Sequence, residues 1–262
     1  MAAAGNLNAP SPWAVRGTRA ALIAGFLGFW ESLAHSGWFY RDVVPPVARV
    51  FDAAASLWTT EAFWRNLVVT MGEVGAAMAI GGSLGVVAGI AIGGSRFMTR
   101  AYEPFLHYLG PTPKIIFFPV LIMLFGVGAG SKIAMGAISC FFPVALSVAA
   151  GMHGIEPVLI RVGRGFGAST AQMVAKVYLP AMRAPVLNGV RLGFGIAVIG
   201  TMLAETKLSN KGLGYLIIQY YAQFDMPRMY AVLIFVFAFA ATINAALSRL
   251  ADRQARNDAP GS

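Results

Sequence analysis

Long stretches without Asp, Glu, Lys or Arg recur along the chain and predict membrane-spanning helices. A helix needs about 20 largely apolar residues to cross the hydrocarbon core of a bilayer. Three stretches reach this length without a charge: Val74–Ser95, Ile133–Met152 and Met229–Ser248. We expect each of them to cross a membrane once.

Three further apolar stretches are each interrupted by one charge: Ala20–Trp38 by Glu31, Pro104–Gly130 by Lys114, and Val186–Ala204 by Arg191. In Pro104–Gly130 the prolines at Pro111 and Pro113 predict a break just before Lys114. Together the six stretches predict an all-α membrane protein with about six transmembrane helices. The first stretch also imitates a signal peptide, because Arg16 and Arg19 precede its apolar part. Its bulky end offers no small-residue cleavage site, so we interpret it as a retained helix.

Composition excludes an ordinary soluble protein. Of the 262 residues, 57% are hydrophobic and 12% are charged, and the mean hydropathy is +0.66. Lys and Arg outnumber Asp and Glu by 20 to 11, a net charge of +9. In a soluble protein this excess would suggest nucleic acid as a partner, but in so apolar a chain it is better explained by membrane orientation, and we expect no nucleic-acid binding.

The positive charges predict which way the chain crosses the membrane. Six crossings place both termini on one side, and eleven Lys and Arg residues fall on that side against seven on the other. The seven are Arg41, Arg49, Arg65, Lys132, Lys207, Lys211 and Arg228. Cytoplasmic loops carry the positive excess, so we expect both termini in the cytoplasm and the chain in a bacterial inner membrane.

No residue pattern predicts chemistry by this chain. The only cysteine, Cys140, excludes an internal disulfide and a multi-cysteine metal site. The three histidines stand alone, without metal-ligand spacing, and no apolar stretch carries the pairings that intramembrane hydrolases need. We therefore expect no catalytic, metal or cofactor site.

Glycine recurs every four residues in the second apolar stretch, at Gly81, Gly85, Gly89 and Gly93. This spacing places the four glycines on nearly one helix face, where they let helix backbones approach closely. The repeat predicts a packing seam, either within the chain or with a second copy.

An amphipathic helix is predicted after Pro45 and Pro46. Apolar residues from Val47 to Trp58 follow helical spacing, with Arg49 and Asp52 on the other face. Such a helix would lie on the outer membrane surface. It would serve there as an interfacial anchor or as part of a docking surface for an extracytoplasmic partner.

The stretch 152–185 is too polar to cross a bilayer and predicts two short helices. The first starts at Pro157 and fails at a cluster of glycines that includes Gly167. The second starts with a capping box, Ser169 and Gln172, and ends at Leu179–Pro180. The pair would project at the cytoplasmic surface with an apolar edge, which fits a groove on another protein.

At this loop the sequence resembles the transmembrane subunits of bacterial ABC importers. Their shared loop reads EAA, three residues, Gly, nine residues, Ile, one residue, Leu-Pro. Gly167, Val177 and Leu179–Pro180 keep this spacing, and Ala168 and Ser169 follow the glycine. The departure is at the start, where Arg161, Val162 and Gly163 replace the EAA triplet.

The resemblance extends from about Pro45 to the last apolar stretch and is closest to the sulfonate, taurine and nitrate branch. The matching pieces are Pro45–Pro46, Pro111–Pro113 to Phe125–Gly126, Arg164, Gly189 to Leu192, Ala204–Glu205 and Gly212 to Gly214. Glu73 stands where these permeases often have arginine. If Glu73 faces the path, we expect a solute preference different from those anions.

The resemblance implies a type I ABC importer fold and a division of labour among several chains. Two permease copies, here expected as a homodimer, form the path for a small anion such as a sulfonate, nitrate or carboxylate. Separate ATPase subunits hold ATP and Mg and dock on the cytoplasmic loop. A periplasmic or lipid-anchored binding protein delivers the solute. This chain has no phosphate-binding loop of its own.

Candidate residues follow from these expectations. The ATPase-coupling residues are Arg161, Arg164, Gly167, Ala168, Ser169, Val177, Leu179 and Pro180. The path candidates are Glu73, Lys114 and Glu205, because ionisable groups at membrane depth are costly. For Glu205, a structural role such as capping outer-loop backbone or pairing with Lys207 is an equal alternative, and Lys114 could instead snorkel.

We expect a cytoplasmic tail at 1–19, one permease domain at 20–250 and a second tail at 251–262. Two other classes of function stay open. A stand-alone channel or secondary transporter would move solute without ATP, and an intramembrane enzyme would turn over without any partner.

Overall fold

The computed structural model describes residues 12–39 and 43–258, and every regular element in these ranges is helical. The first half contains α1 (Pro12–His35), α2 (Val47–Trp58), α3 (Glu61–Ala77), the π-helix η1 (Met78–Gly82), α4 (Ser83–Gly93), α5 (Arg96–Leu109), the 3-10 helix η2 (Lys114–Phe117) and α6 (Phe118–Phe125). The second half contains α7 (Ala129–His153), α8 (Pro157–Gly165), α9 (Thr170–Met173), the π-helix η3 (Val174–Tyr178), α10 (Leu179–Ala181), α11 (Arg183–Lys207), α12 (Leu213–Ala222) and α13 (Met226–Asp258).

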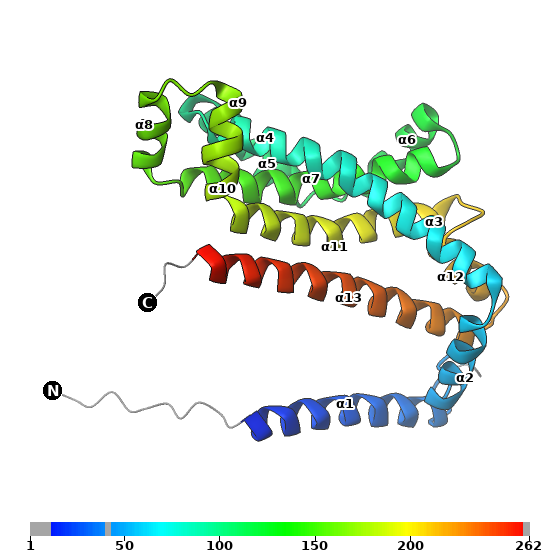
Figure 1. The fold of residues 1–262 in the computed structure, drawn as a ribbon. Coiled ribbons are helices and arrows are strands. Elements are labelled where there is room, and N and C mark those ends of the chain that lie inside the picture. Colours follow the sequence, from blue (N-terminus) through cyan, green and yellow to red (C-terminus); the bar gives the residue numbers. More distant parts are fainter. Residues whose placement is uncertain (1–11, 40–42, 259–262) are drawn as a thin grey trace.

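Helices α3–α4, α7, α11 and α13 run side by side, whereas α1 stands apart and joins the rest mainly through α2; the ends of these helices lie at two opposite ends of the molecule (Figure 1). One end holds α8, α9 and α10, the start of α1 and the end of α13, and we call it the α8 end. The other holds α2 and α12, and we call it the α12 end. Residues 1–11 and 259–262 of the predicted tails lie outside the described residues, and so do the loop charges Arg41 and Asp42.

Four described helices are long and apolar enough to cross a membrane: Glu61–Gly93, Ala129–His153, Arg183–Lys207 and Met226–Arg249. The pair Arg96–Leu109 and Lys114–Phe125 passes the same test together and is bent by 91° between its halves. The prediction of about six crossings thus exceeds the four or five that length and composition support. The all-α membrane fold itself is confirmed.

The bent pair contacts α7 at three levels, from its last residue to near its start, and we therefore interpret the two halves as one broken crossing. The Thr99 hydroxyl lies 3.2 Å from His153 Nε2, at the last residue of α7. Further along, Leu106 packs with Ala145. In α6, Phe118 clusters with Met135, near the start of α7. The break falls at Pro111–Pro113, where proline removes helical hydrogen bonds.

The predicted crossing Ala20–Trp38 falls on α1, which does not reach the apolarity of the other spans. Two arginines near its start and Glu31 near its end lower the hydropathy. Glu31 has a local task, because its Oε2 accepts a hydrogen bond of 2.9 Å from the Val47 amide at the start of α2. A carboxylate at a helix start compensates unpaired backbone amides.

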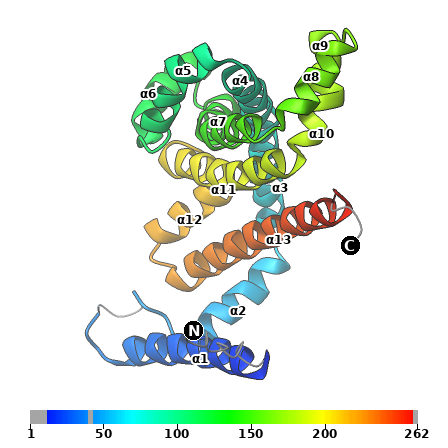
Figure 2. The same cartoon turned by 90° about the vertical axis from the view of Figure 1, so that its left-hand side faces the viewer.

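Helix α7 is the central element, and α4 and α11 pack along it (Figure 2). The glycine repeat forms the α4 side of this contact. A Cβ at Gly85 would stand 2.9 Å from the Phe141 carbonyl oxygen, and one at Gly89 would stand 2.6 Å from Val148 Cβ. Gly93 meets Met152 in the same way, and Gly81 meets Ala137 and Cys140. The seam is therefore within the chain.

The outer surface of the bundle is apolar. Large side chains are exposed on α1 and α6, among them Phe26 at 62% and Met123 at 86%. In water such a surface would be costly. In a bilayer it faces hydrocarbon, which agrees with the multi-pass membrane protein that the helices indicate.

Candidate functional site

The predicted projection between α7 and α11 is present and consists of α8, α9, η3 and α10. Helix α8 starts at Pro157 and ends at Gly165, as the proline and the glycine cluster predicted. Gly167 has a φ of +69°. Its amide donates to the Arg164 carbonyl (3.0 Å), and the Ala168 amide donates to the Gly163 carbonyl (3.1 Å). These two bonds form a Schellman motif, which requires a left-handed residue at Gly167.

The second part of the projection starts with the predicted capping box. The Gln172 amide donates to Ser169 Oγ (3.3 Å), and the Ser169 amide donates to Gln172 Oε1 (2.9 Å). Two unpaired amide groups at the helix start are thereby satisfied. The π-helical turn Val174–Tyr178 then leads into α10, and Met182 leaves helical geometry before α11.

Gly163 lets the two parts of the projection pack closely. A Cβ there would stand 2.6 Å from Met173 Sδ and 3.3 Å from Val177 Cγ2. Val177 is the residue at the isoleucine position of the loop pattern. The glycine that replaces the last alanine of the EAA triplet therefore has a packing role.

The outer side of the projection is apolar and exposed, with basic residues beside it. Phe166 is 88% exposed and Val162 is 50% exposed. Arg161 and Arg164 are exposed on the same helix. The exposed apolar side chains are Val158, Leu159, Val162, Phe166 and Leu179. Such a patch is typical of a protein contact surface.

A second set of candidate residues lies buried towards the α12 end, and we call it the polar cluster: Asn66, Thr70, Glu73, Lys132 and Glu205. Each of these residues is at most 8% exposed. Lys132 Nζ lies 2.6 Å from Glu73 Oε1 and donates to Ser209 Oγ at 3.1 Å. Lys132, which we predicted to be an outer-loop charge, is thus a buried ion-pair partner in the first turn of α7.

Glu205 holds the backbone that joins α11 to α12. Its Oε2 accepts a hydrogen bond of 2.7 Å from the Gly214 amide, and its Oε1 accepts one of 2.7 Å from the Thr70 hydroxyl. Thr70 in turn accepts from the Leu213 amide at 2.8 Å. Glu73 Oε2, by contrast, is buried without a hydrogen-bond partner among the described residues. The arrangement corresponds to the structural alternative for Glu205, with backbone contacts instead of Lys207.

The polar cluster anchors the connection 208–212 to α3 and α7. Asn66 Oδ1 accepts from the Gly212 amide at 2.7 Å, and Gly212 has a φ of +106°. A side chain on Gly212 would also collide with the Glu205 carboxyl group. Asn66, Thr70 and Glu73 were spaced four and three residues apart on one helix face, a pattern that could have indicated their common role.

Lys114, the third path candidate, lies at the bend between α5 and α6. Its ammonium donates to the carbonyls of Leu109, Gly110 and Thr112 and lies 4.8 Å from the centre of the Phe142 ring. A lysine has three donors, so all of them are engaged in holding the bend.

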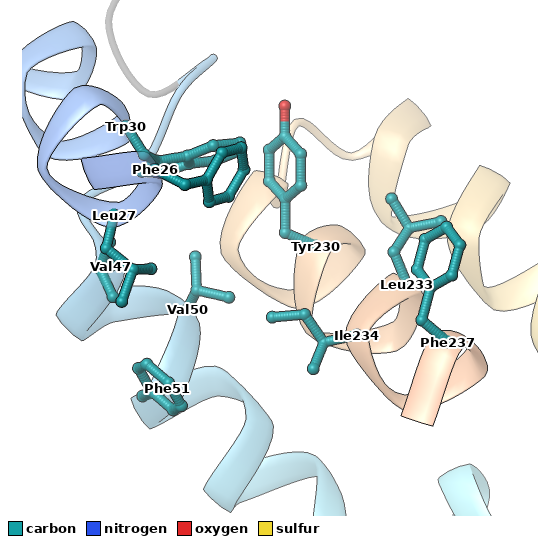
Figure 3. A pocket seen from close by; sticks show the side chains of 10 residues that line it. All are labelled: Phe26, Leu27, Trp30, Val47, Val50, Phe51, Tyr230, Leu233, Ile234 and Phe237. Carbon is teal, nitrogen blue, oxygen red and sulfur yellow. The ribbon is translucent and has the colours of Figure 1, made fainter. Parts of the chain in front are cut away.

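An apolar cavity of about 400 Å³ lies between α1, α2 and α13. Figure 3 shows its side chains converging from these three helices. They are Phe26, Leu27, Trp30, Val47, Val50, Phe51, Tyr230, Leu233, Ile234 and Phe237. A charged solute would lose its hydration there without gaining polar partners, so this cavity is not a site for an anion.

Comparison with known proteins shows the family to which the chain belongs. Residues 81–257 match the family model described as "Binding-protein-dependent transport system inner membrane component". The putative aliphatic sulfonates transport permease protein SsuC of Bacillus subtilis is 30% identical over 89% of this chain and 84% of its own length. The taurine transport system permease protein TauC of Escherichia coli is 28% identical over 74% of this chain and 73% of its own.

A solved chain of the MetNI methionine ABC transporter, described as inward facing, has a similar fold. The TM-score is 0.62 with 21% sequence identity, and the match covers 76% of this chain and 98% of that one. The likeness identifies the type I ABC importer transmembrane fold.

Proposed function

The chain belongs to the family of binding-protein-dependent transport system inner membrane components, and we propose on this premise that it is the transmembrane permease subunit of an ATP-driven ABC importer for a small organic anion. Two of the relatives described above are named as permeases for taurine and for aliphatic sulfonates, which supports a sulfonate as the solute class. ATP hydrolysis would take place on a separate ATPase subunit, with its own ATP and Mg.

The observation that carries the proposal is the exposed projection α8–α10. Gly167, at the glycine position of the loop pattern, has a φ of +69°, a conformation that favours glycine, and Phe166 beside it is 88% exposed. Nothing in the described part of the chain covers this apolar surface. An ATPase subunit is the partner that the family supplies for such a surface, so we assign the projection to ATPase docking.

The α8 end would face the cytoplasm. The predicted cytoplasmic arginines Arg16, Arg96, Arg161 and Arg249 belong to elements that meet at this end (Figure 1). Lys132 no longer counts among the positive residues on the outer side, because it is buried and paired. The excess of positive charge on the cytoplasmic side is therefore larger than the sequence predicted. Helix α1 would then be the sixth crossing, since its exposed Phe26 and Ile23 need hydrocarbon around them.

A second permease copy and a solute-binding protein complete the proposed assembly. The copies would form a path between them, as a homodimer, and a periplasmic or lipid-anchored binding protein would deliver solute at the α12 end. The anchored connection 208–212 belongs to that end and gives the binding protein a fixed surface.

Adjacent glycines allow a matched test of the projection. Gly167→Ala forces a side chain into a left-handed conformation, which costs roughly 1–2 kcal/mol. Gly165→Ala has open space around the added Cβ and an ordinary helical conformation. We expect Gly167→Ala and Phe166→Asp to lose the ATPase on co-purification and to lose ATP-dependent import, whereas Gly165→Ala keeps both.

Three outcomes would overturn the proposal. The first is a membrane preparation that never retains an ATPase subunit, or that retains it equally with Phe166→Asp. The second is solute movement by this chain alone in liposomes without ATP, which would favour a stand-alone channel or secondary transporter. The third is turnover of a solute in the absence of every partner, which would indicate an intramembrane enzyme.

A further inference from the structure

Helix α5 carries a stripe of ionisable side chains along one face. Arg96, Arg100, Glu103 and His107 follow one another at steps of four, three and four residues. At 3.6 residues per turn these steps keep all four on one face. We call them, with the neighbouring Thr99, the α5 stripe.

Outside the stripe, the exposed surface of α5 is apolar. Phe97 is 74% exposed, Phe105 is 62% exposed and Tyr102 is 50% exposed. Leu106 is the buried residue of the helix and packs on α7. The helix thus has one face for the fold, one for hydrocarbon, and the stripe between them.

The α5 stripe lies in the half of the broken crossing that is nearer the α8 end. Thr99 lies beside the last residue of α7, and Leu106 packs with Ala145, eight residues from that end. Eight residues of helix measure about 12 Å. His107, which follows Leu106, therefore lies well inside the span rather than at its surface.

The fold leaves the ionisable groups of the stripe largely without partners, whereas the Thr99 hydroxyl donates to the Ile92 carbonyl at 2.9 Å. The His107 side chain is 63% exposed, and its contact with Glu103 is long, 3.7 Å from Nε2 to Oε1. Within the described residues, the guanidinium groups of Arg96 and Arg100 form no ion pair. A shallow groove of about 400 Å³ runs along this face, lined by Thr99, Glu103, Pro104, His107 and Tyr108. Ionisable groups inside a membrane face water or a protein interior, not lipid.

The path candidates from the sequence are already engaged elsewhere. Glu73 is paired with Lys132, Glu205 accepts from the Gly214 amide and the Thr70 hydroxyl, and the donors of Lys114 hold the bend. The α5 stripe, by contrast, offers two guanidinium groups and an imidazole against a single carboxylate. This balance is complementary to an anion.

Building on the proposed function, we propose that the α5 stripe lines the cytoplasmic half of the solute path and that Arg100 and His107 contact the passing anion. A guanidinium can bind a sulfonate or carboxylate with two parallel hydrogen bonds. Arg96, at the start of α5, would meet the anion last, at the cytoplasmic mouth. The specificity of the path for negative charge would then come from α5.

Single-cysteine variants can test the stripe, because the only native cysteine, Cys140, is fully buried. Glu103→Cys and His107→Cys place thiols on the stripe. Tyr102→Cys and Phe105→Cys place them at similar depth on the apolar face. Each variant is assembled with its ATPase and binding protein in proteoliposomes and treated with a methanethiosulfonate that carries a sulfonate group. Unmodified protein measures the background from Cys140.

We expect the stripe cysteines to react at least about tenfold faster than the apolar-face cysteines, because the reactive thiolate forms only where water reaches it. Labelling His107→Cys should also stop ATP-dependent import, and labelling Phe105→Cys should not. Arg100→Gln should lower import of the anion without loss of assembly, with Arg100→Lys recovering part of it.

Three results would overturn the path assignment while the proposed function stands. They are equal reaction on both faces, unreactive stripe cysteines that instead cross-link between two copies at residue 107, and full import after complete labelling of His107→Cys. Absence of ATP-dependent import by the unmodified assembly would refute the proposed function, and the path with it.

Discussion

Replacing Lys132 with methionine should destabilise the protein strongly. Lys132 and Glu73 are each 5% exposed in their side chains and lie 2.6 Å apart. Removing one partner leaves a buried carboxylate without its counter-charge, which costs about 3–5 kcal/mol. Glu205 is buried in the same polar cluster, so Lys132→Met leaves two carboxyl groups in the cluster without a cation.

The second variant in this test removes both charges. Glu73→Gln combined with Lys132→Met keeps the side-chain volumes and eliminates the uncompensated carboxylate. Replacing a buried pair completely is often neutral or even stabilising. We therefore expect the double variant to recover most of the loss, and the two substitutions to be strongly non-additive.

Thermal unfolding of the purified complex in detergent measures the effect. For a chain of this size each kcal/mol corresponds to roughly 2–4 °C, so Lys132→Met should lower the midpoint by about 10 °C. Lys207→Met is a suitable control, because Lys207 is exposed at the same end and forms no ion pair among the described residues. A midpoint within about 2 °C of the unmodified protein, or a double variant as unstable as the single one, would refute this reasoning.

Two glycine substitutions extend the test to packing and backbone geometry. Gly89→Val would overfill the α4–α7 seam, because Val148 Cβ already lies 2.6 Å from the site of a new Cβ, and it should lower the free energy of unfolding by about 2 kcal/mol. Gly75→Ala, with open space around its new Cβ, should not destabilise the helix. Equal unfolding midpoints for the two variants would contradict the seam. Gly212→Ala combines a φ of +106° with a collision against Glu205. It should destabilise the protein more than Gly126→Ala, which has a φ of +75° and open space and bears only a backbone strain of roughly 1–2 kcal/mol. A larger loss of stability for Gly126→Ala would contradict the polar cluster.

Local signals in the sequence predicted the parts of the fold that depend on local interactions. The amphipathic pattern predicted α2 at Val47–Trp58, which is where it lies. Pro157 and the Ser169–Gln172 box predicted both starts of the projection. Each signal acts within a few residues through backbone hydrogen bonds, so the sequence alone contains the information.

The polar cluster could not be predicted in the same way, because its partners are distant in sequence. Glu73 and Lys132 meet only when α3 packs on α7. Because the sequence was divided into stretches without charges, Glu73 placed the predicted start of the second crossing at Val74, whereas the helix begins at Glu61. A neutral ion pair is compatible with a span, but its neutrality is visible only in three dimensions.

The bend between α5 and α6 shows the same limit. Pro111 and Pro113 predicted a break in the crossing, but not its 91° angle. The bend brings α6 into contact with the first part of α7, and Lys114 donates to the Gly110 carbonyl at the bend. The stripe on α5 is likewise visible in the sequence, yet its exposure follows from packing that leaves Leu106 as the buried residue of the helix.

Helix α11 connects the two candidate sites. Its 25 residues measure about 37 Å, begin directly after α10 and end beyond Glu205. At the α8 end, Met182 is fully buried and Gly151 lies against Pro185, so the projection is packed on the bundle rather than hinged freely. At the α12 end, Glu205 holds the Gly214 amide and the Thr70 hydroxyl. Because packed helices move as units rather than deform smoothly, a force that an ATPase applies to α10 would reach the connection 208–212 through α11.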